Sequence, residues 1–254
     1  MWELYDELIR PIPDTLQPAR LFQNEYITLA QFGSHAGGTI TNNIDTIEPV
    51  IADGNYDSLS WKETASLIKS WNLKEASLGA AAINAFYNQD GKIRQHIDSR
   101  QDLQIGQEQN PFAALSSRFD GKKIATIGHF CFAEPYIQNT TAETHIIELY
   151  PEKGDYPLSA CECFLPEMDY VMITGYTLIN KTLPRLLELA KNAYVVLVGC
   201  SVPMAPALFD FGLRELDGSV LTEFEKTRFF AEETGHVAML KTGQRLRFMK
   251  KYDA

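Results

Sequence analysis

Four short, nearly continuous apolar segments in the second half of the chain place the strongest constraint on its fold. They read KKIATIGHF, THIIELYP, DYVMITGYT and AYVVLVGCS. Strands buried on both faces of a parallel sheet have this composition, because helices cover the sheet from either side. Segments with helical spacing lie between them, and TLPRLLELAKN places Leu183, Leu186, Leu187 and Ala190 on one face. The alternation predicts an α/β fold with a Rossmann-like doubly wound, mostly parallel sheet.

The first half of the chain has a different order of elements. An amphipathic helix is predicted in MWELYDELI, and RLFQNEYITLAQF (20–32) alternates as one or two antiparallel strands do. We expect GSHAGGT to form a Gly-rich loop. WKETASLIKSWN and LKEASLGAAAINAFYN have the spacing of two helices. Strands followed by helices predict a small α+β unit.

A polar, Gln-rich segment lies between the two halves and contains Pro111 and Gly121. This composition predicts a linker or inter-domain crossing. We therefore expect a first domain over 1–97, a linker over 98–121 and a second domain over 122–254. HVAMLK and RLRFMKK are expected to add an antiparallel edge to the second domain, with the basic KTGQRLRFMKKY as a solvated hairpin.

Charge and composition exclude several classes of function. The net charge of -10 disfavours nucleic-acid binding, which needs a clustered basic surface. No apolar run reaches the roughly 18 residues that a membrane span requires, and MWELYDELIRPIP lacks the layout of a signal peptide. We therefore expect a cytoplasmic protein. Its four cysteines are expected to be reduced, buried and inert thiols.

Candidate ligand-binding residues follow from the position of the predicted strands. In open α/β sheets, ligands bind at the carboxyl ends of the strands. Those ends carry Gly128, His129, Glu148, Gly175 and Ser201. The imidazole of His129 could act as an acid, a base or a ligand, or it could simply pack.

Glu148 lies at a spacing that suits ribose recognition. It follows Gly128 by 20 residues, as does the acidic side chain that binds a ribose in dinucleotide folds. The G-x-G-x-x-G turn is missing, which disfavours NAD and leaves a nucleoside or an S-adenosylmethionine-like ligand. A solvated strand-end glutamate explains the residue equally well.

The turn VMITGYTLINKTL (171–183) contains more polar residues than capping requires. Thr177, Asn180 and Thr182 could each cap the following helix, which needs one cap. A helix N-terminus also attracts carboxylate or phosphate groups. We favour Asn180 as a ligand-facing residue, with capping as the alternative.

The chain resembles the "putative heavy-metal chelation" domain family. The similar segments in the second half are IGHF (127–130), IIELYPEKGDYP (146–157), DYVMITGYTLINKTL (169–183) and VLVGCSVPMAP (196–206). The first half is similar to the companion domain of that family through GGTIT (37–41) and SLGAAAINA (77–85). The resemblance implies an enolase N-terminal-like domain followed by a Rossmann-like domain, with the site between them.

By motif position, the resemblance also implies a set of site residues: His129, Glu148, Asp155, Thr177, Asn180 and Ser201, together with Asn84 and the Gly37–Gly38 loop. It implies condensation or hydrolysis in the synthesis of a pterin-, flavin- or siderophore-like metal chelator. One turn departs from the family, with GCSVP where a G-P-S-T-P sequence is usual. Cys200 therefore takes no family role, and a ligand contact at Val202 is in doubt.

Three hypotheses follow. The leading one is a cleft that binds a small polar metabolite, with His129 and Asn180 as catalytic candidates and either a divalent metal or a nucleoside-type ligand as cofactor. A non-catalytic protein that binds a metal or metallophore is the second, and an S-adenosylmethionine-dependent methyltransferase is the third. All three predict a small-molecule or metal-chelate partner, with no nucleic acid and no membrane.

Overall fold

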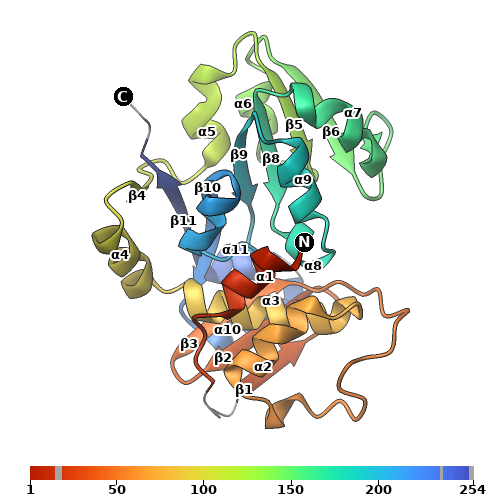
Figure 1. Ribbon diagram of the computed structural model, residues 1–254, viewed down its shortest axis with the longest axis vertical. Helices are drawn as coiled ribbons and strands as arrows, with labels where there is room; N and C mark the ends of the chain where they lie inside the picture. The colour runs from red at the N-terminus through yellow and green to blue at the C-terminus, as the bar shows by residue number, and fades with distance from the viewer. Residues whose placement is uncertain (15–18, 235–236, 252–254) are drawn as a thin grey trace.

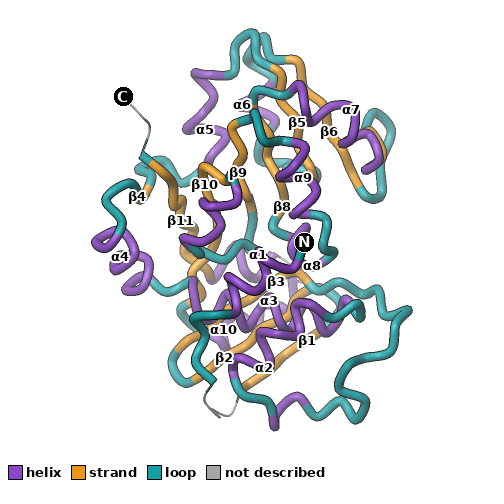
Figure 2. Tube along the Cα trace, in the orientation of Figure 1, coloured by secondary structure: helices purple, strands orange, loops and turns teal. Residues whose placement is uncertain are grey.

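The structure is a computed structural model that describes residues 1–14, 19–234 and 237–251. Figure 1 shows the first three strands and their helices at one end and most of the parallel strands at the other, and Figure 2 shows the same layout by secondary structure. The strands are β1 (Ala19–Gln23), β2 (Ile27–Phe32), β3 (His35–Ile40), β4 (Leu103–Ile105), β5 (Lys123–Ile127), β6 (Glu143–Glu148), β7 (Tyr156–Pro157), β8 (Tyr170–Thr174), β9 (Tyr194–Val198), β10 (Leu213–Leu221) and β11 (Gly243–Lys250). The α-helices are α1 (Trp2–Ile9), α2 (Trp61–Ser66), α3 (Leu73–Tyr87), α4 (Asp90–Ser99), α5 (Pro111–Leu115), α6 (Glu134–Ile137), α7 (Cys161–Phe164), α8 (Tyr176–Ile179), α9 (Leu183–Leu189), α10 (Phe224–Thr234) and α11 (Val237–Thr242).

The second half of the chain forms the predicted parallel sheet. Its strands lie in the order β7-β6-β5-β8-β9-β10, and every neighbouring pair is parallel. The chain passes from β5 to β6 on one side and then returns to β8 on the other. The switch point therefore lies between β5 and β8, where open α/β sheets bind ligands. The prediction of a mostly parallel α/β sheet is confirmed, while the likeness to an enolase N-terminal domain stays a prediction.

Both faces of this sheet are covered, which explains the continuous apolar segments. On β8, Val171 and Ile173 share a core with Leu186 of α9. Met172, between them, points to the other face and packs with Phe112 of α5. Successive residues of a strand face opposite sides of the sheet. A strand between two helical layers therefore needs apolar side chains at every position.

The first half contributes three antiparallel strands, β1, β2 and β3, to the same sheet. The predicted Gly-rich loop GSHAGGT is wrong, since His35–Ile40 forms β3 and pairs with β2 over its whole length. β3 also meets β10 at Ala36, opposite Leu221. The strand was missed because its glycines mimic a loop, whereas they in fact allow close packing.

Gly37 shows this packing most clearly. A Cβ atom at this position would lie 2.0 Å from the backbone nitrogen of Ala85 and 2.5 Å from the carbonyl oxygen of Ala81 in α3. At Gly38, a Cβ atom would meet Met239 and Leu29 side chains on the opposite side of the strand. Small residues on both elements therefore bring β3 and α3 into backbone contact.

The C-terminal segment differs from the expected edge hairpin. Val237–Thr242 is helix α11, and β11 lies between β10 and β4, with its central residues buried. The antiparallel pairing of RLRFMKK is confirmed, but its solvated-edge position is wrong. Residues 98–121, predicted as a linker, contain β4 and α5 in the structure. The boundaries at 97 and 122 stay a prediction.

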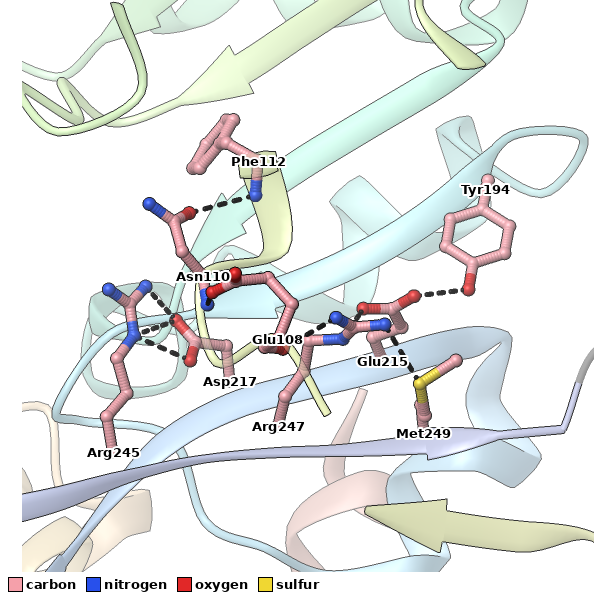
Figure 3. A network of polar contacts seen from close by, with 9 residues as sticks. All are labelled: Glu108, Asn110, Phe112, Tyr194, Glu215, Asp217, Arg245, Arg247 and Met249. Atoms are coloured by element: carbon pink, nitrogen blue, oxygen red, sulfur yellow. Dashed lines mark hydrogen bonds and ion pairs between the residues drawn. The ribbon is translucent and has the colours of Figure 1, made fainter. Parts of the chain in front are cut away.

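Two ion pairs with buried carboxylates join β10 to β11 (Figure 3). Arg247 Nε lies 2.8 Å from Glu215 Oε2, and neither side chain is more than 5% exposed. Arg245 Nε donates to the carboxylate of Asp217, which is fully buried. The hydroxyl of Tyr194 donates a hydrogen bond to Glu215 Oε1, at 2.6 Å. Burial raises the pKa of Asp217 to about 6, and Arg245 opposes that rise.

We expect Gly37→Ala to destabilise the fold by about 3 kcal/mol or more, because the new methyl group overlaps backbone atoms that cannot move independently. Gly91→Ala is the matched control, since a Cβ atom there has no neighbour within 4 Å. Its stability should stay the same or rise by about 1 kcal/mol, as for glycine replacement in a helix. Urea denaturation of both variants tests this, and equal stabilities would refute the close-packing argument.

We expect Arg247→Met to cost about 3–5 kcal/mol, because it leaves Glu215 buried without its cation. Adding Glu215→Gln to Arg247→Met should restore part of that loss, which a double-mutant cycle in denaturant measures. Arg185→Met is the control, since Arg185 pairs with Glu162 at the surface, where both side chains are more than half exposed. Its cost should stay below about 1 kcal/mol.

Candidate functional site

A pocket of about 320 Å³ lies at the carboxyl edge of the parallel strands. It is lined by the ends of β5, β6 and β8, by the turn after β8, by Leu158 and by Ile40 and Thr41 at the end of β3. The lining is complete with Ile127, Gly128, His129, Phe130, Ile147, Glu148, Leu149, Tyr150, Thr174, Tyr176, Thr177, Asn180 and Thr182. The pocket occupies the switch point that the strand order defines.

Gly128 and Glu148 fix the β5 side of the pocket. Gly128 has a φ of +112°, a conformation that L-residues with a side chain rarely adopt. The turn it permits aims the backbone N–H of His129 at Glu148 Oε1, at 2.7 Å. The other carboxylate oxygen of Glu148 accepts the N–H of Leu149 at 3.0 Å. Two backbone donors thus hold the Glu148 carboxylate in place, and each of its oxygens has a further lone pair.

The imidazole of His129 is partly exposed and lies beside Asp155. His129 Nε2 is 3.6 Å from Asp155 Oδ1, too far for a hydrogen bond but close enough for an ion pair when the ring is protonated. The Asp155 side chain is 6% exposed, and its other oxygen accepts the N–H of Glu152. Asp155 therefore contacts His129 but is not part of the pocket lining.

The turn after β8 is folded by Asn180 itself. Asn180 Oδ1 accepts hydrogen bonds from the N–H and the hydroxyl of Thr182, at 3.1 and 2.7 Å. Thr182, and not Asn180, occupies the N-cap position of α9, and no side-chain hydrogen bond caps this helix. Within the described residues, Asn180 Nδ2 has no hydrogen-bond partner. The capping alternative is thus replaced by a turn-forming role that leaves the amide donor at the pocket wall.

Lys181, next in the chain, holds this turn against the first half of the protein. It has a φ of +65°, which is uncommon for a residue with a side chain. The side chain is buried, and Nζ donates to the carbonyl oxygens of Ser70 and Ile179, at 2.5 and 2.7 Å. Burial lowers the pKa of Lys181 to about 8. The residue thereby fixes Asn180 at its position in the pocket.

The remaining predicted residues lie beside the pocket or beneath it. Thr177 lines it, but its hydroxyl donates to the carbonyl of Thr174 at 2.7 Å. Gly175 lies against the 201–202 turn, where a Cβ atom would meet Val202 at 2.7 Å. Ser201 accepts from the hydroxyl of Thr39 at 2.7 Å. These contacts join β8, β3 and the turn after β9.

Asn84, which the resemblance implied as a site residue, joins α3 to β3. Its Nδ2 donates to the carbonyl of Gly38 at 2.8 Å, and the side chain is buried. Asn84 Oδ1 is buried without a hydrogen-bond partner within the described residues. The structure thus brings together Gly128, His129, Glu148, Thr177 and Asn180 in one pocket. It places Gly37, Gly38, Asn84, Gly175 and Ser201 in the packing beneath it.

Several pocket residues had no signal in the sequence analysis. Phe130, Tyr150 and Tyr176 supply aromatic walls. Burial raises the pKa of Tyr176 to about 12, so its phenol stays protonated at neutral pH and can donate a hydrogen bond. Ile40 and Thr41 come from the first half of the chain. The GGTIT segment was the signal available for these two residues, because it ends at Thr41.

In residues 1–14, 19–234 and 237–251, no group of three or more His, Cys, Asp or Glu side chains could together hold a metal ion. All four cysteines are free. The expectation that all four are buried is wrong, since Cys131 and Cys163 are exposed. Cys163 points outward because Cys161, two positions earlier on the same helix, points inward.

None of the helices in the described part of the chain is both long and apolar enough to cross a membrane.

The fold and the pocket define a mixed α/β protein with a candidate ligand site at the carboxyl edge of its parallel strands. The family model described as "Putative heavy-metal chelation" (DUF364) matches residues 110–250. The chain belongs to this family, which confirms the resemblance seen in its motifs.

Known relatives support this assignment over nearly the whole chain. A solved DUF364 structure from Desulfitobacterium hafniense, of unknown function, shares 35% identity and has a TM-score of 0.86, covering 99% of both chains. A DUF364 structure from Pyrococcus horikoshii shares the fold at 19% identity, with a TM-score of 0.71 and coverage of 96% of this chain and 98% of the other. An uncharacterized protein of Methanocaldococcus jannaschii is 28% identical over 215 residues, or 81% of this chain and 78% of the relative.

We predict that Lys181 makes folding stability rise with pH in alkaline solution. Its folded-state pKa of about 8 lies below the ordinary value of about 10.4. Between these values the unfolded chain binds more protons, so raising the pH favours the folded state, by on the order of 2 kcal/mol. Denaturant titrations from about pH 7.5 to 9.5 measure this rise relative to Lys181→Met, whose residue cannot titrate. Parallel curves for the two proteins would contradict the prediction.

Proposed function

We propose that the pocket at the carboxyl edge binds a small ring-containing metabolite that carries hydroxyl groups, of the pterin, flavin or nucleoside type. The observation that carries the proposal is the lining itself. Apolar and aromatic walls from Phe130, Tyr150 and Tyr176 surround a small number of fixed polar groups. Pockets for small ligands and cofactors are built in this way, with few polar groups that set orientation.

The polar groups suggest how such a ligand is oriented. Glu148 is held by two backbone N–H groups and keeps lone pairs to accept hydrogen bonds from ligand hydroxyls. Asn180 Nδ2 is a donor on the β8 side, and Tyr176 adds a phenol. An acceptor on one wall and donors on another suit a ring with exocyclic oxygen or nitrogen atoms and a polyol substituent.

We propose that the ligand, and not a cluster of protein side chains, holds the metal. The described residues lack a three-ligand cluster of their own, while pterins, flavins and siderophores carry oxygen and nitrogen atoms that bind metal. We propose that the protein acts in the synthesis or processing of such a chelator. In this proposal His129, which lines the pocket beside Asp155, transfers the proton.

The first test identifies the ligand and the role of Asn180. Small molecules released from the native protein are analysed by mass spectrometry, and riboflavin, a pterin and adenosine are titrated onto wild-type protein. We expect at least one ring compound to bind and to raise the melting temperature. Asn180→Ala should weaken its binding at least tenfold while costing about 1 kcal/mol of stability, as for loss of a turn hydrogen bond.

Asn24→Ala is the matched control for this variant. Asn24 Oδ1 accepts two backbone N–H bonds, from Tyr26 and Ile27, in a turn of the same kind outside the pocket. It should lose similar stability and keep full affinity. Equal affinity of Asn180→Ala and wild type, or the absence of any bound ring compound, would refute the proposal.

His129→Gln distinguishes a catalytic role of the protein from ligand binding alone. A catalytic role predicts that the variant binds the ligand with wild-type affinity but fails to convert it. Unchanged conversion would show that His129 does not transfer the proton. Metal analysis of protein purified with and without chelator tests the alternative of direct metal binding, which predicts a stoichiometric ion that the chelator removes.

A further inference from the structure

A second pocket, of about 500 Å³, lies at the opposite, amino-terminal edge of the parallel strands. Its lining comes from the starts of β8, β9 and β10, the turn before β5 and the end of β11. β8 separates this edge from the carboxyl edge by five residues, or about 13 Å. The two pockets are therefore separate sites at the two ends of the same strands.

The lining of this second pocket is strongly basic. Five cationic side chains contribute to it: Arg118, Lys122, Arg214, Lys250 and Lys251. The single carboxylate is Asp169, so the lining carries five positive charges against one negative charge, a net of +4. The chain as a whole has a net charge of -10 and 23 basic residues. A concave cluster of this sign on an acidic protein focuses a local positive potential.

Asp169, the one carboxylate of the lining, already has partners of its own. Asp169 accepts the N–H of Lys123 at 2.9 Å and pairs with Lys122 Nζ at 3.3 Å. These donors lower the pKa of Asp169 and keep it ionised. Its charge is therefore shared between Lys122 and Lys123, and Lys123 is not part of the lining. Lys250 Nζ donates to the carbonyl of Phe209 at 3.2 Å, which positions the ammonium group while two of its three protons remain for other acceptors.

Two tyrosine rings add an aromatic surface to the pocket. Tyr170 and Tyr194 are partners in the β8–β9 register, and their ring centroids lie 5.6 Å apart. Phe119 packs edge-on against Tyr170, and the hydroxyl of Tyr194 donates to buried Glu215. Both rings are therefore held in place, and they offer apolar surface next to the cations.

We propose that this basic pocket binds a small ligand with two or more phosphate groups, of the size of a nucleoside di- or triphosphate. One phosphate is satisfied by two or three donors, whereas five cations suit a chain of several phosphates. Arginine guanidinium groups bind phosphate oxygens in pairs, and lysine supplies point charge. The site is independent of the carboxyl-edge pocket and of its proposed metabolite.

The test uses inorganic tripolyphosphate, orthophosphate and ATP as probes in calorimetric titrations of the full chain. We expect tripolyphosphate to bind at least tenfold more tightly than orthophosphate and to weaken as salt screens the charges. Arg214→Ala/Lys251→Ala should lower its affinity at least tenfold. Both side chains are exposed, so the variant should fold normally, and its circular dichroism spectrum and melting temperature verify this.

The control is Lys226→Ala/Arg228→Ala, which removes the same charge from exposed positions on α10. It should keep wild-type affinity, as should Asn180→Ala in the other pocket. An equal loss of affinity in the α10 control would show that binding depends only on the net charge of the protein, and it would overturn the proposal. Failure of tripolyphosphate to bind at millimolar concentration would also overturn it. Tighter binding of ATP than tripolyphosphate supports a nucleotide that contacts the tyrosines, and equal binding supports recognition of the phosphates alone.

Discussion

The burial of two acidic residues on β10 is the constraint on which the rest of the structure depends. β10 pairs with β9, β11 and β3, so it joins the parallel strands to the antiparallel ones. Glu215 and Asp217 lie on this strand and are fully buried. Buried carboxylates are tolerated only with well-placed partners, and the arginines of β11 supply them (Figure 3). β11 thus supplies the cations that allow two carboxylates to be buried on the strand that joins the two halves of the sheet.

The candidate site depends on the continuity of the sheet across the two halves of the chain. Because β3 is joined to β10, its end at Ile40 reaches the pocket at the carboxyl ends of β5 and β8. Smaller contacts secure this arrangement: Ser201 bonds to Thr39, and Lys181 bonds to Ser70. Each connects the second half of the chain to the first. The pocket is therefore a product of both halves, and changes in their packing are expected to alter its shape.

The two edges of the parallel strands carry pockets of opposite chemistry. The carboxyl edge has aromatic walls with a fixed carboxylate, and the amino edge has five cations around two tyrosines. A doubly wound sheet leaves both ends of its parallel strands open to solvent, because its helices cover only the faces. One fold can thus present two ligand sites without competition for the same residues. The family's description as a metal chelation group fits a metabolite that holds the metal itself, as we propose for the carboxyl-edge pocket.

The sequence by itself determined the parallel α/β sheet and the edge at which the candidate site lies. Continuous apolar segments reveal strands that are buried on both faces, and the polar residues after them mark the carboxyl edge, so His129, Glu148 and Asn180 were found together. Only the tertiary structure decided the identity of β3 and β10, whose glycines and acids are typical of loops. Their strand state depends on partners distant in sequence: the small residues of α3 at Gly37, and the arginines of β11. The local sequence pattern of a strand does not contain the residues that neutralise its charges or pack against its backbone, because those residues are distant in sequence and meet it only in the folded chain.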